Sequence, residues 1–324
     1  EIHLNQAPAR PQAARQIFES LRTQSLTLSQ SERLDYTGVW LELVDNNDAG
    51  FYQKAEAFLK DWPGSDYFPE VSMLLARRLF QDNRSDEAYA LFAEAAESRP
   101  NSPFAQLASV FAAQSSPQDD RSILAWKTIA YSDSSYAVQG LHELGLQFIK
   151  KDRFDEARDA FSEILTQTER GTEIYYAALA DTGYAYYMES LANGQDEALM
   201  QEASNAFSRL SRQSDAPAYW RYSAALRRAR CLEAMGNQEV ALEIYRSIVS
   251  SSQGSDSIDG LDRDQRTQEW VFRAGFFAIQ ILEANEDWRS AIKMADQLAQ
   301  KNGPRAIEAS SLAEKMRLKH WVWD

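Results

Sequence analysis

Cysteine and histidine are scarce in this chain of 324 residues. The one cysteine, Cys231, excludes an internal disulfide framework and any zinc site built on cysteine ligands. None of the three histidines, His3, His142 and His320, belongs to an HExxH motif or lies beside a candidate nucleophile motif. The phosphate-binding patterns GxxxxGK[ST] and GxGxxG do not occur. We therefore expect no catalytic residues, no cofactor and no metal site.

Long apolar runs and an excess of positive charge are also missing. No run reaches the eighteen apolar residues of a membrane-spanning helix. The net charge of −14 opposes nonspecific binding to nucleic acid through Coulomb repulsion, so no nucleic-acid partner is expected. The chain begins at Glu1 without an initiator Met or an apolar signal-peptide region, which suggests a processed or trimmed start.

Helical periodicity dominates what is present, and residues 138–168 show it best. Two stretches of helical period flank a charged turn at residues 150–155. Gly145 and Ala157 are small, and Phe161 lies four residues after Ala157. A small residue on each facing side lets two antiparallel helices approach closely, and a large ring fills the space beside that contact. This stretch is predicted to be a helical hairpin.

The same pattern recurs along the chain. It consists of a small or apolar residue, Ala twelve residues later, and an apolar or aromatic residue four after that. The matching triplets are Leu43, Ala55, Leu59; Ala76, Ala88, Phe92; Ala113, Ala125, Ile129; Gly145, Ala157, Phe161; Ala229, Ala241, Tyr245; Ile279, Ala291, Ala295; and, with a longer turn, Gly183, Ala203, Phe207. Seven hairpins are predicted.

The recurrence resembles the tetratricopeptide repeat family over about residues 31–302. Three of the steps between successive alanines, 33, 37 and 32 residues, lie close to the family's period of about 34. The family's small and aromatic positions are filled best in the hairpins of Ala76 and Gly145, although most units lack the first-helix Trp. The resemblance implies an all-α, right-handed superhelical array of about seven hairpins with a capping helix at each end.

The chain divides into three predicted segments. Residues 1–28 form an arm and a capping helix of about residues 12–23, whose apolar face carries Ala14, Ile17, Phe18 and Leu21. Residues 29–302 form the repeat array, which begins at Ser29 or Ser31 and has insertions near 189–197 and 250–264. Residues 303–324 form a C-terminal capping helix, about 305–320, and a Trp-rich tail.

Two junctions between hairpins share a motif. Residues 61–68 and 98–105 each place Pro, then Ser two residues later, then an aromatic residue, so that Pro ends one helix and Ser caps the next. These junctions are similar to those of bacterial envelope repeat proteins of the BamD and TolA-binding (YbgF/CpoB) type. That resemblance implies a periplasmic or envelope-associated protein, with a cytoplasmic location as the alternative.

The first helices of the hairpins supply the candidate binding residues. In the repeat family these helices line a concave groove, and the register points to Arg77, His142, Leu146, Lys150, Tyr184, Tyr187, Arg227 and Arg230. Arg binds carboxylates with two hydrogen bonds and Tyr stacks or donates one, so an extended or acidic peptide is the expected ligand. The alternative is that these residues serve packing between repeats or face solvent. The two-carboxylate clamp of chaperone-binding repeats is not expected, because His142 and Leu146 stand where Lys and Asn are needed.

The predicted function is a non-catalytic scaffold or adaptor that holds a partner protein, as a subunit of an envelope complex. The alternative is an enzyme or an enzyme-associated subunit whose chemistry lies in the insertions. Peripheral contact with a membrane is a further alternative for the basic, Trp-rich residues 315–323, although a cover over the end of the array is the preferred interpretation.

A calcium loop is the other alternative considered. Asp45, Asn47, Gly50 and Glu56 fall at the first, third, sixth and twelfth positions of such a loop, but Ala49 stands where a ligand is expected. A solvated hairpin turn is therefore preferred.

Overall fold

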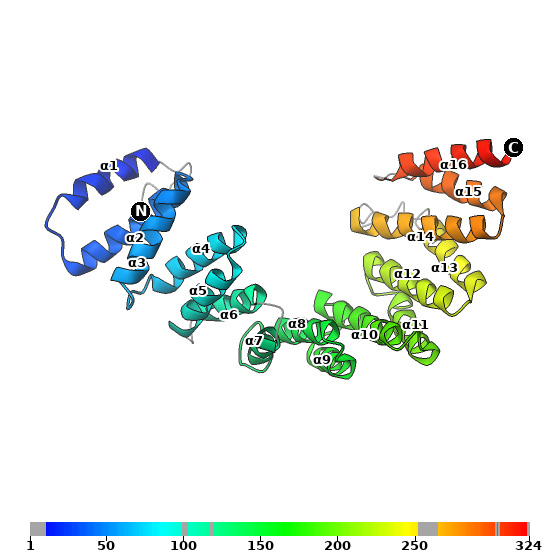
Figure 1. Ribbon diagram of the computed structural model, residues 1–324, viewed down its shortest axis with the longest axis horizontal. Helices are drawn as coiled ribbons and strands as arrows, with labels where there is room; N and C mark the ends of the chain where they lie inside the picture. Colours follow the sequence, from blue (N-terminus) through cyan, green and yellow to red (C-terminus); the bar gives the residue numbers. More distant parts are fainter. Residues whose placement is uncertain are drawn as a thin grey trace. The chain divides into compact units, whose positions relative to one another are not determined.

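The structure is a computed structural model that describes residues 11–98, 103–116, 120–251, 265–301, 303 and 305–322. Within these residues every regular element is an α-helix (Figure 1). The chain forms two compact units, Glu1–Leu141 and His142–Asp324, and the boundary between them lies inside one helix, α8.

The helices have the following bounds. The first unit contains α1 (Pro11–Arg22), α2 (Leu28–Val44), α3 (Asp48–Asp61), α4 (Phe68–Gln81), α5 (Ser85–Ser98), α6 (Pro103–Ser115) and α7 (Asp120–Ala130). Helix α8 is Ala137–Lys150. The second unit continues with α9 (Phe154–Gln167), α10 (Glu173–Ala192), α11 (Glu197–Ser211), α12 (Ala218–Ala234), α13 (Gln238–Ser251), α14 (Gln265–Ala284), α15 (Trp288–Ala299) and α16 (Ala306–His320).

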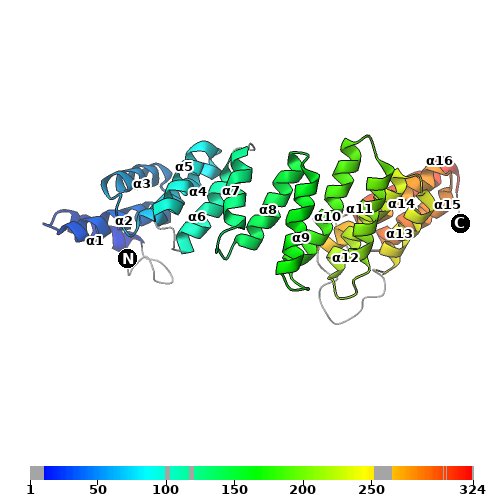
Figure 2. The same ribbon diagram turned by 90° about the horizontal axis from the view of Figure 1, so that it is seen from below.

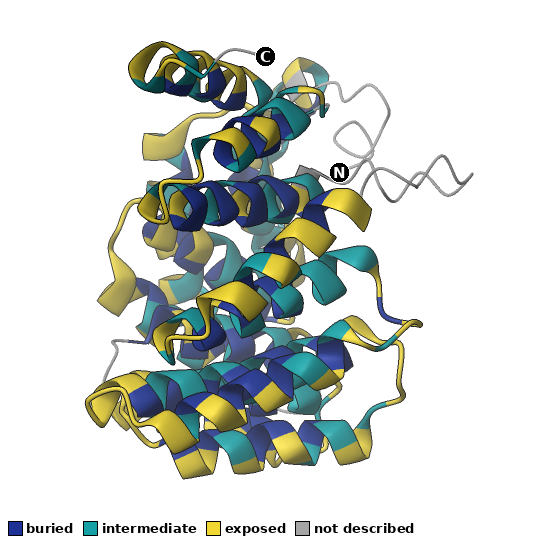
Figure 3. Cartoon of the chain, turned by 90° about the vertical axis from the view of Figure 1, so that its right-hand side faces the viewer, coloured by how far each residue is buried: buried dark blue, intermediate teal, exposed yellow. Residues whose placement is uncertain are grey.

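The all-α prediction of seven hairpins between two single helices is confirmed. The hairpins are α2–α3, α4–α5, α6–α7, α8–α9, α10–α11, α12–α13 and α14–α15, and α1 and α16 stand at the ends. In the second unit α9, α10 and α11 run side by side (Figure 2). Buried residues line the sides where helices face one another, whereas exposed residues occupy the outward sides (Figure 3).

Close approach at Gly145 explains the best hairpin. A Cβ atom built on Gly145 would lie 2.5 Å from the ring of Phe161, and both Phe161 and Ala157 are fully buried. The predicted roles of these three residues are confirmed.

A residue in the left-handed conformation ends the first helix of most hairpins and fixes their register. It is Asn83, Asp152 and Glu286 in three of them, and the alanine of the predicted triplet follows five residues later in each. Asn46 holds this position between α2 and α3, and Phe51 follows it by five residues. The equivalent triplet there is Val39, Phe51, Ala55.

The predicted triplet of the first hairpin is therefore wrong by one helical turn. Val39, Phe51 and Ala55 are buried, whereas Leu43 and Leu59 are half-buried. Apolar residues recur every three or four positions along a helix face, so the sequence pattern alone matches equally well one turn away. The prediction of a turn at residues 45–50 is confirmed, because Asn47 is the N-cap of α3 and accepts a hydrogen bond from the Gly50 amide.

Two other hairpins depart from the pattern. Gly183 approaches the ring of Phe207, but these residues are 24 positions apart, against 16 for Gly145 and Phe161. The insertion predicted near residues 189–197 is confirmed: it extends α10 to Ala192, before a turn at Asn193 and Gly194. In α6–α7 the predicted Ala125 is half-buried, and the neighbouring Trp126 takes the interior place.

The end helices match their predicted ranges, with three corrections. Ala14 and Phe18 of α1 are buried, but Ile17 is 47% exposed because it lies off the face that packs on α2. The N-cap of α2 is Thr27, which forms a capping box with Gln30, rather than a serine. On α16 the Trp321 ring is 81% exposed, so it does not finish the cover over the array. Trp323 lies outside the described residues.

The junction at residues 61–68 was half correctly predicted. Helix α3 ends at Asp61, and Pro63 follows its C-cap, as expected. Ser65 does not cap α4: it lies in the turn and accepts a hydrogen bond from the Tyr67 amide, and Tyr67 is the N-cap. Residues 99–102 of the second junction and 252–264 of the second insertion lie outside the described residues.

Candidate functional site

The first helices of the second unit form one layer. Helices α10, α12 and α14 lie together on one side, and α11, α13 and α15 lie on the other (Figure 1). Helix α12 contacts both α10 and α14 and is the middle of the first-helix layer. Side chains that are not used to pack against the second helices therefore project from this layer.

Helix α12 is basic although the protein is acidic. It carries four arginines, Arg221, Arg227, Arg228 and Arg230, and a single carboxylate, Glu233. The whole chain has 48 acidic and 34 basic residues, so this helix reverses the charge of its surroundings. A local excess of positive charge on one element attracts anionic groups.

Arg227 is held by aromatic rings. Its guanidinium carbon lies 5.9 Å from the ring centroid of Tyr184 on α10 and 5.9 Å from that of Phe207 on α11. Among the described residues it has no carboxylate partner. At the outer limit of a cation–π attraction, the two rings attract the guanidinium without using its N–H groups, which stay available to an anion.

The Arg230 side chain contacts α14, whereas Arg227 lies near α10 and α11. Its guanidinium carbon lies 4.6 Å from the centroid of Phe277, and its Nη1 donates to Glu233 Oε2 at 2.9 Å. The hydroxyl of the buried Tyr245 donates to the same carboxylate oxygen at 2.7 Å. Burial lowers the pKa of Arg230, but the charges of Glu233 and Tyr245 and the hydrogen bonds with them together outweigh it, so the net pKa is raised. Arg230 thus stays charged.

Arg228 and Arg221 lie in less favourable surroundings. Burial, and then the charge of Arg212, lower the pKa of the Arg228 guanidinium. The Nε of Arg221 is buried and has no hydrogen-bond partner among the described residues. An unpaired buried donor such as Arg221 Nε costs about 1–3 kcal/mol.

The three candidates on α8 are His142, Leu146 and Lys150, and His142 packs against neighbouring helices. His142 Nε2 lies 2.9 Å from Asp181 Oδ2 of α10, and its ring centroid is 5.8 Å from that of Phe161. Leu146 is half-buried and Lys150 is exposed at the end of α8. His142 therefore serves contact between neighbouring hairpins, in line with the alternative given for these residues.

The remaining predicted residues lie apart. Tyr187 is half-buried against the core formed by α10, α11 and α12. Arg77 is exposed on α4 and belongs to the first unit. Of the eight predicted residues, the structure brings Tyr184 into contact with Arg227 and places Arg230 on the same helix.

Sequence reasoning missed the contribution of α14. Arg273 stacks on Trp270 at 5.1 Å, and Arg305, in the turn before α16, stacks on Phe276 at 4.2 Å. The pattern that predicted Ile279 as the packing residue of this helix places Phe276 three positions before it, on the neighbouring part of the same helix surface. The sequence pattern could therefore have identified Phe276 as part of this surface.

The described part of the chain holds no group of three or more His, Cys, Asp or Glu side chains arranged around a metal position. Within it, no helix has the length and apolar character needed to cross a membrane.

Comparisons with known proteins agree with the fold. The family model described as "Tetratricopeptide repeat" matches residues 223–255, which include the hairpin of Ala229, Ala241 and Tyr245. No curated protein matches the sequence. The solved C-terminal part of a TPR repeat-containing protein from Cytophaga hutchinsonii is 16% identical, with 84% of this chain and 97% of that chain covered and a TM-score of 0.51. A tetratricopeptide repeat protein from Parabacteroides merdae is 12% identical, with 88% and 99% covered and a TM-score of 0.45. The chain therefore contains a tetratricopeptide repeat at residues 223–255, and its all-α hairpin fold is that of tetratricopeptide repeat proteins.

Proposed function

We propose that the chain is a non-catalytic scaffold that binds an extended, acidic segment of a partner protein on the first-helix layer of its second unit. The observation that carries this proposal is Arg227, a charged group held by two rings and without a carboxylate partner among the described residues. Arg230 presents a second guanidinium one turn away on the same helix. An extended segment that follows α12 would meet both charges.

The aromatic rings beside the two arginines favour a peptide over a small anion. Tyr184 and Phe277 flank α12 on its two sides, so apolar surface accompanies the two charges. A peptide of acidic and apolar residues matches this mixture, because its carboxylates bind Arg and its side chains cover the rings. Preorganised guanidinium groups lower the ordering cost of binding.

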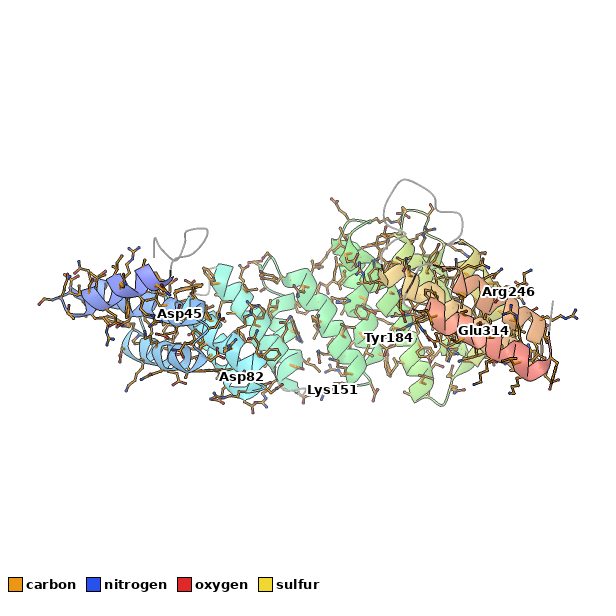
Figure 4. All side chains as sticks on the ribbon, turned by 90° about the horizontal axis from the view of Figure 1, so that it is seen from above. Asp45, Asp82, Lys151, Tyr184, Arg246 and Glu314 are labelled. Carbon is orange, nitrogen blue, oxygen red and sulfur yellow. The ribbon has the colours of Figure 1, made fainter. Side chains whose placement is uncertain are left out.

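A titration with a defined probe tests the proposal. A fluorescent ten-residue peptide rich in Glu, Asp and Leu is expected to bind the whole chain, and Arg227→Ala is expected to weaken binding by roughly tenfold, because a charge-assisted hydrogen bond contributes ~1.5–3 kcal/mol. The matched control is Arg246→Ala on the second helix α13, an exposed arginine outside the first-helix layer (Figure 4). Equal losses for the two variants, or no loss for Arg227→Ala, would reject this site.

Partner identity and location are tested separately. We propose that the chain works in a bacterial envelope complex, supported by the form of the junction at residues 61–68. Cell fractionation followed by identification of co-purifying proteins is the measurement, and a purely cytosolic signal would refute the envelope location.

A further inference from the structure

The outer side of α16 carries an apolar stripe that nothing in the chain covers among the described residues. Ile307, Leu318 and Trp321 are 81%, 66% and 81% exposed. Ile307, Ser311, Glu314 and Leu318 follow steps of four, three and four residues, which is the spacing of a helix that packs along a second helix. Trp321 is the C-cap of α16 in the left-handed conformation and lies just beyond this run. The rest of α16 is fixed, because Ala309, Ala313 and Met316 are buried.

Two contacts hold α16 firmly enough to present this stripe. Arg317 on its inner side donates to Asp296 of α15. The His320 ring stacks on Trp288 at 3.5 Å with an angle of 9° between the planes. The exposed side of α16 appears in Figure 3, and Glu314 is labelled on this helix in Figure 4.

The stripe contains a hollow of the kind that receives a side chain from another helix. A shallow hollow on α16 is lined by Ser311, Glu314, Lys315, Leu318 and Lys319. The first four are spaced i, i+3, i+4 and i+7, which is the arrangement of a hole in knobs-into-holes packing. The small Ser311 at its edge leaves room for a large residue.

We infer that α16 is the contact through which two copies of this chain associate, with the two helices antiparallel about a two-fold axis near Glu314. Residues 307 and 321 are equally far from 314, so Ile307 of one copy lies level with the C-cap of α16 in the second copy, and the two-fold axis repeats this arrangement on the other side. Ser311 then lies level with residue 317 and next to Leu318 of the second copy, which places a large residue beside a small one.

The charges along α16 are complementary to those of α16 in an antiparallel second copy. Its first turn is acidic at Glu308, and its last turn is basic at Arg317, Lys319 and His320. Glu308, Lys315 and Lys319 are exposed on one edge of the stripe, spaced by seven and four residues. In the antiparallel pair Glu308 lies opposite residue 320 of the second copy, one residue from Lys319. Glu308 and Lys319 lie on the same edge of the contact. Glu308 also accepts two hydrogen bonds from Arg305 of its own copy, at 2.7 and 2.9 Å.

The association is weak and reversible. A contact of two 15-residue helices lies at or below the ~1,200 Å² lower bound of specific stable interfaces. The two Glu314 carboxylates come near each other at the axis and oppose pairing, so Glu314→Gln is expected to strengthen it.

Analytical ultracentrifugation of the whole chain over a wide concentration range tests the proposal. We expect a monomer–dimer equilibrium that Leu318→Ser weakens by roughly tenfold or more, because the leucine is buried once in each copy. The matched control is Leu124→Ser on α7, since Leu124 is 65% exposed and Leu318 is 66% exposed. Circular dichroism verifies that each variant is folded.

A charge exchange makes the orientation testable. Glu308→Lys alone and Lys319→Glu alone are each expected to weaken the homodimer, and a mixture of the two variants is expected to form heterodimers, in which both edges again pair opposite charges. A chain that stays monomeric at millimolar concentration, or a dimer equally sensitive to Leu124→Ser, would overturn the proposal. Binding of a monomeric chain to anionic phospholipid vesicles, lost in Leu318→Ser, would also overturn it and assign the stripe to a membrane surface.

Discussion

Adding one methyl group at Gly145 should destabilise the α8–α9 hairpin. The Cβ atom of Gly145→Ala would lie 2.5, 2.8 and 3.0 Å from three atoms of the Phe161 ring, well inside the optimal carbon separation of ~3.5–4.0 Å. The ring is 0% exposed, so it cannot turn away without moving its neighbours.

The expected net effect follows from two opposing magnitudes. Overpacking a buried site costs about 1–3 kcal/mol. Alanine is favoured over glycine in a helix by about 1 kcal/mol. The variant should therefore lose about 1 kcal/mol of unfolding free energy, whereas helix propensity alone would stabilise it by that amount, so the two accounts differ in sign.

The assay must resolve one hairpin within an array. Repeat arrays unfold partly unit by unit, so urea denaturation is combined with hydrogen exchange of the amides in α8 and α9. Gly64→Ala is the control, since a Cβ there meets no atom within 4 Å. The reasoning is refuted if Gly145→Ala is as stable as the parent or more so. Phe161→Leu should cost less in the Gly145→Ala background than in the parent, because the smaller side chain relieves the contact.

Two further predictions concern buried groups. Burial raises the pKa of Glu42, but hydrogen bonds from Lys54, Arg15 and Asn47 outweigh it and lower the pKa to about 2 from 4.5, so the stabilisation is complete above about pH 5 and is lost as the pH falls toward 2. Acid denaturation should show a loss of up to about 3 kcal/mol of unfolding free energy over this pH range. The Glu42→Gln variant should lack this part of the pH dependence, and an acid profile identical to that of the parent would contradict the prediction. Cys231 is fully buried and its thiol pKa is raised to about 12, chiefly by burial, so a thiol reagent should label it only as fast as the hairpin opens, and rapid labelling of the native chain would contradict its placement.

The repeat architecture was predictable because packing imposes it on the sequence. Gly145 and Ala157 are small because two helices approach closely there, and at Gly145 even a Cβ atom would lie 2.5 Å from the Phe161 ring. Such positions constrain the residue type strongly, and the pattern of one hairpin then identifies the others.

Register and end residues were harder to predict for a physical reason. Shifting Leu43, Ala55 and Leu59 by one turn gives Val39, Phe51 and Ala55, which presents almost the same face, so only the left-handed Asn46 distinguishes them. Trp321 was expected to cover the array because a large apolar ring gains from burial, yet no facing residue is available to it in the described chain.

The candidate site was predictable only in part. Register correctly placed Tyr184, Arg227 and Arg230 on first helices, but whether an arginine has a carboxylate partner depends on residues far away in sequence. Glu233 neutralises part of Arg230, and no carboxylate does so for Arg227 among the described residues. Pairing of that kind is a property of the folded chain.

The lengthened α10–α11 hairpin shows how one hairpin can grow without a change to its interior. Its extra eight positions between Gly183 and Phe207 amount to about one turn on each helix, which keeps both packing faces aligned with their neighbours. A single added residue would rotate one face away from its partner by about 100°, since a helix has 3.6 residues per turn. A hairpin can therefore lengthen by paired turns, one on each helix, while its interior still aligns with the neighbouring hairpins.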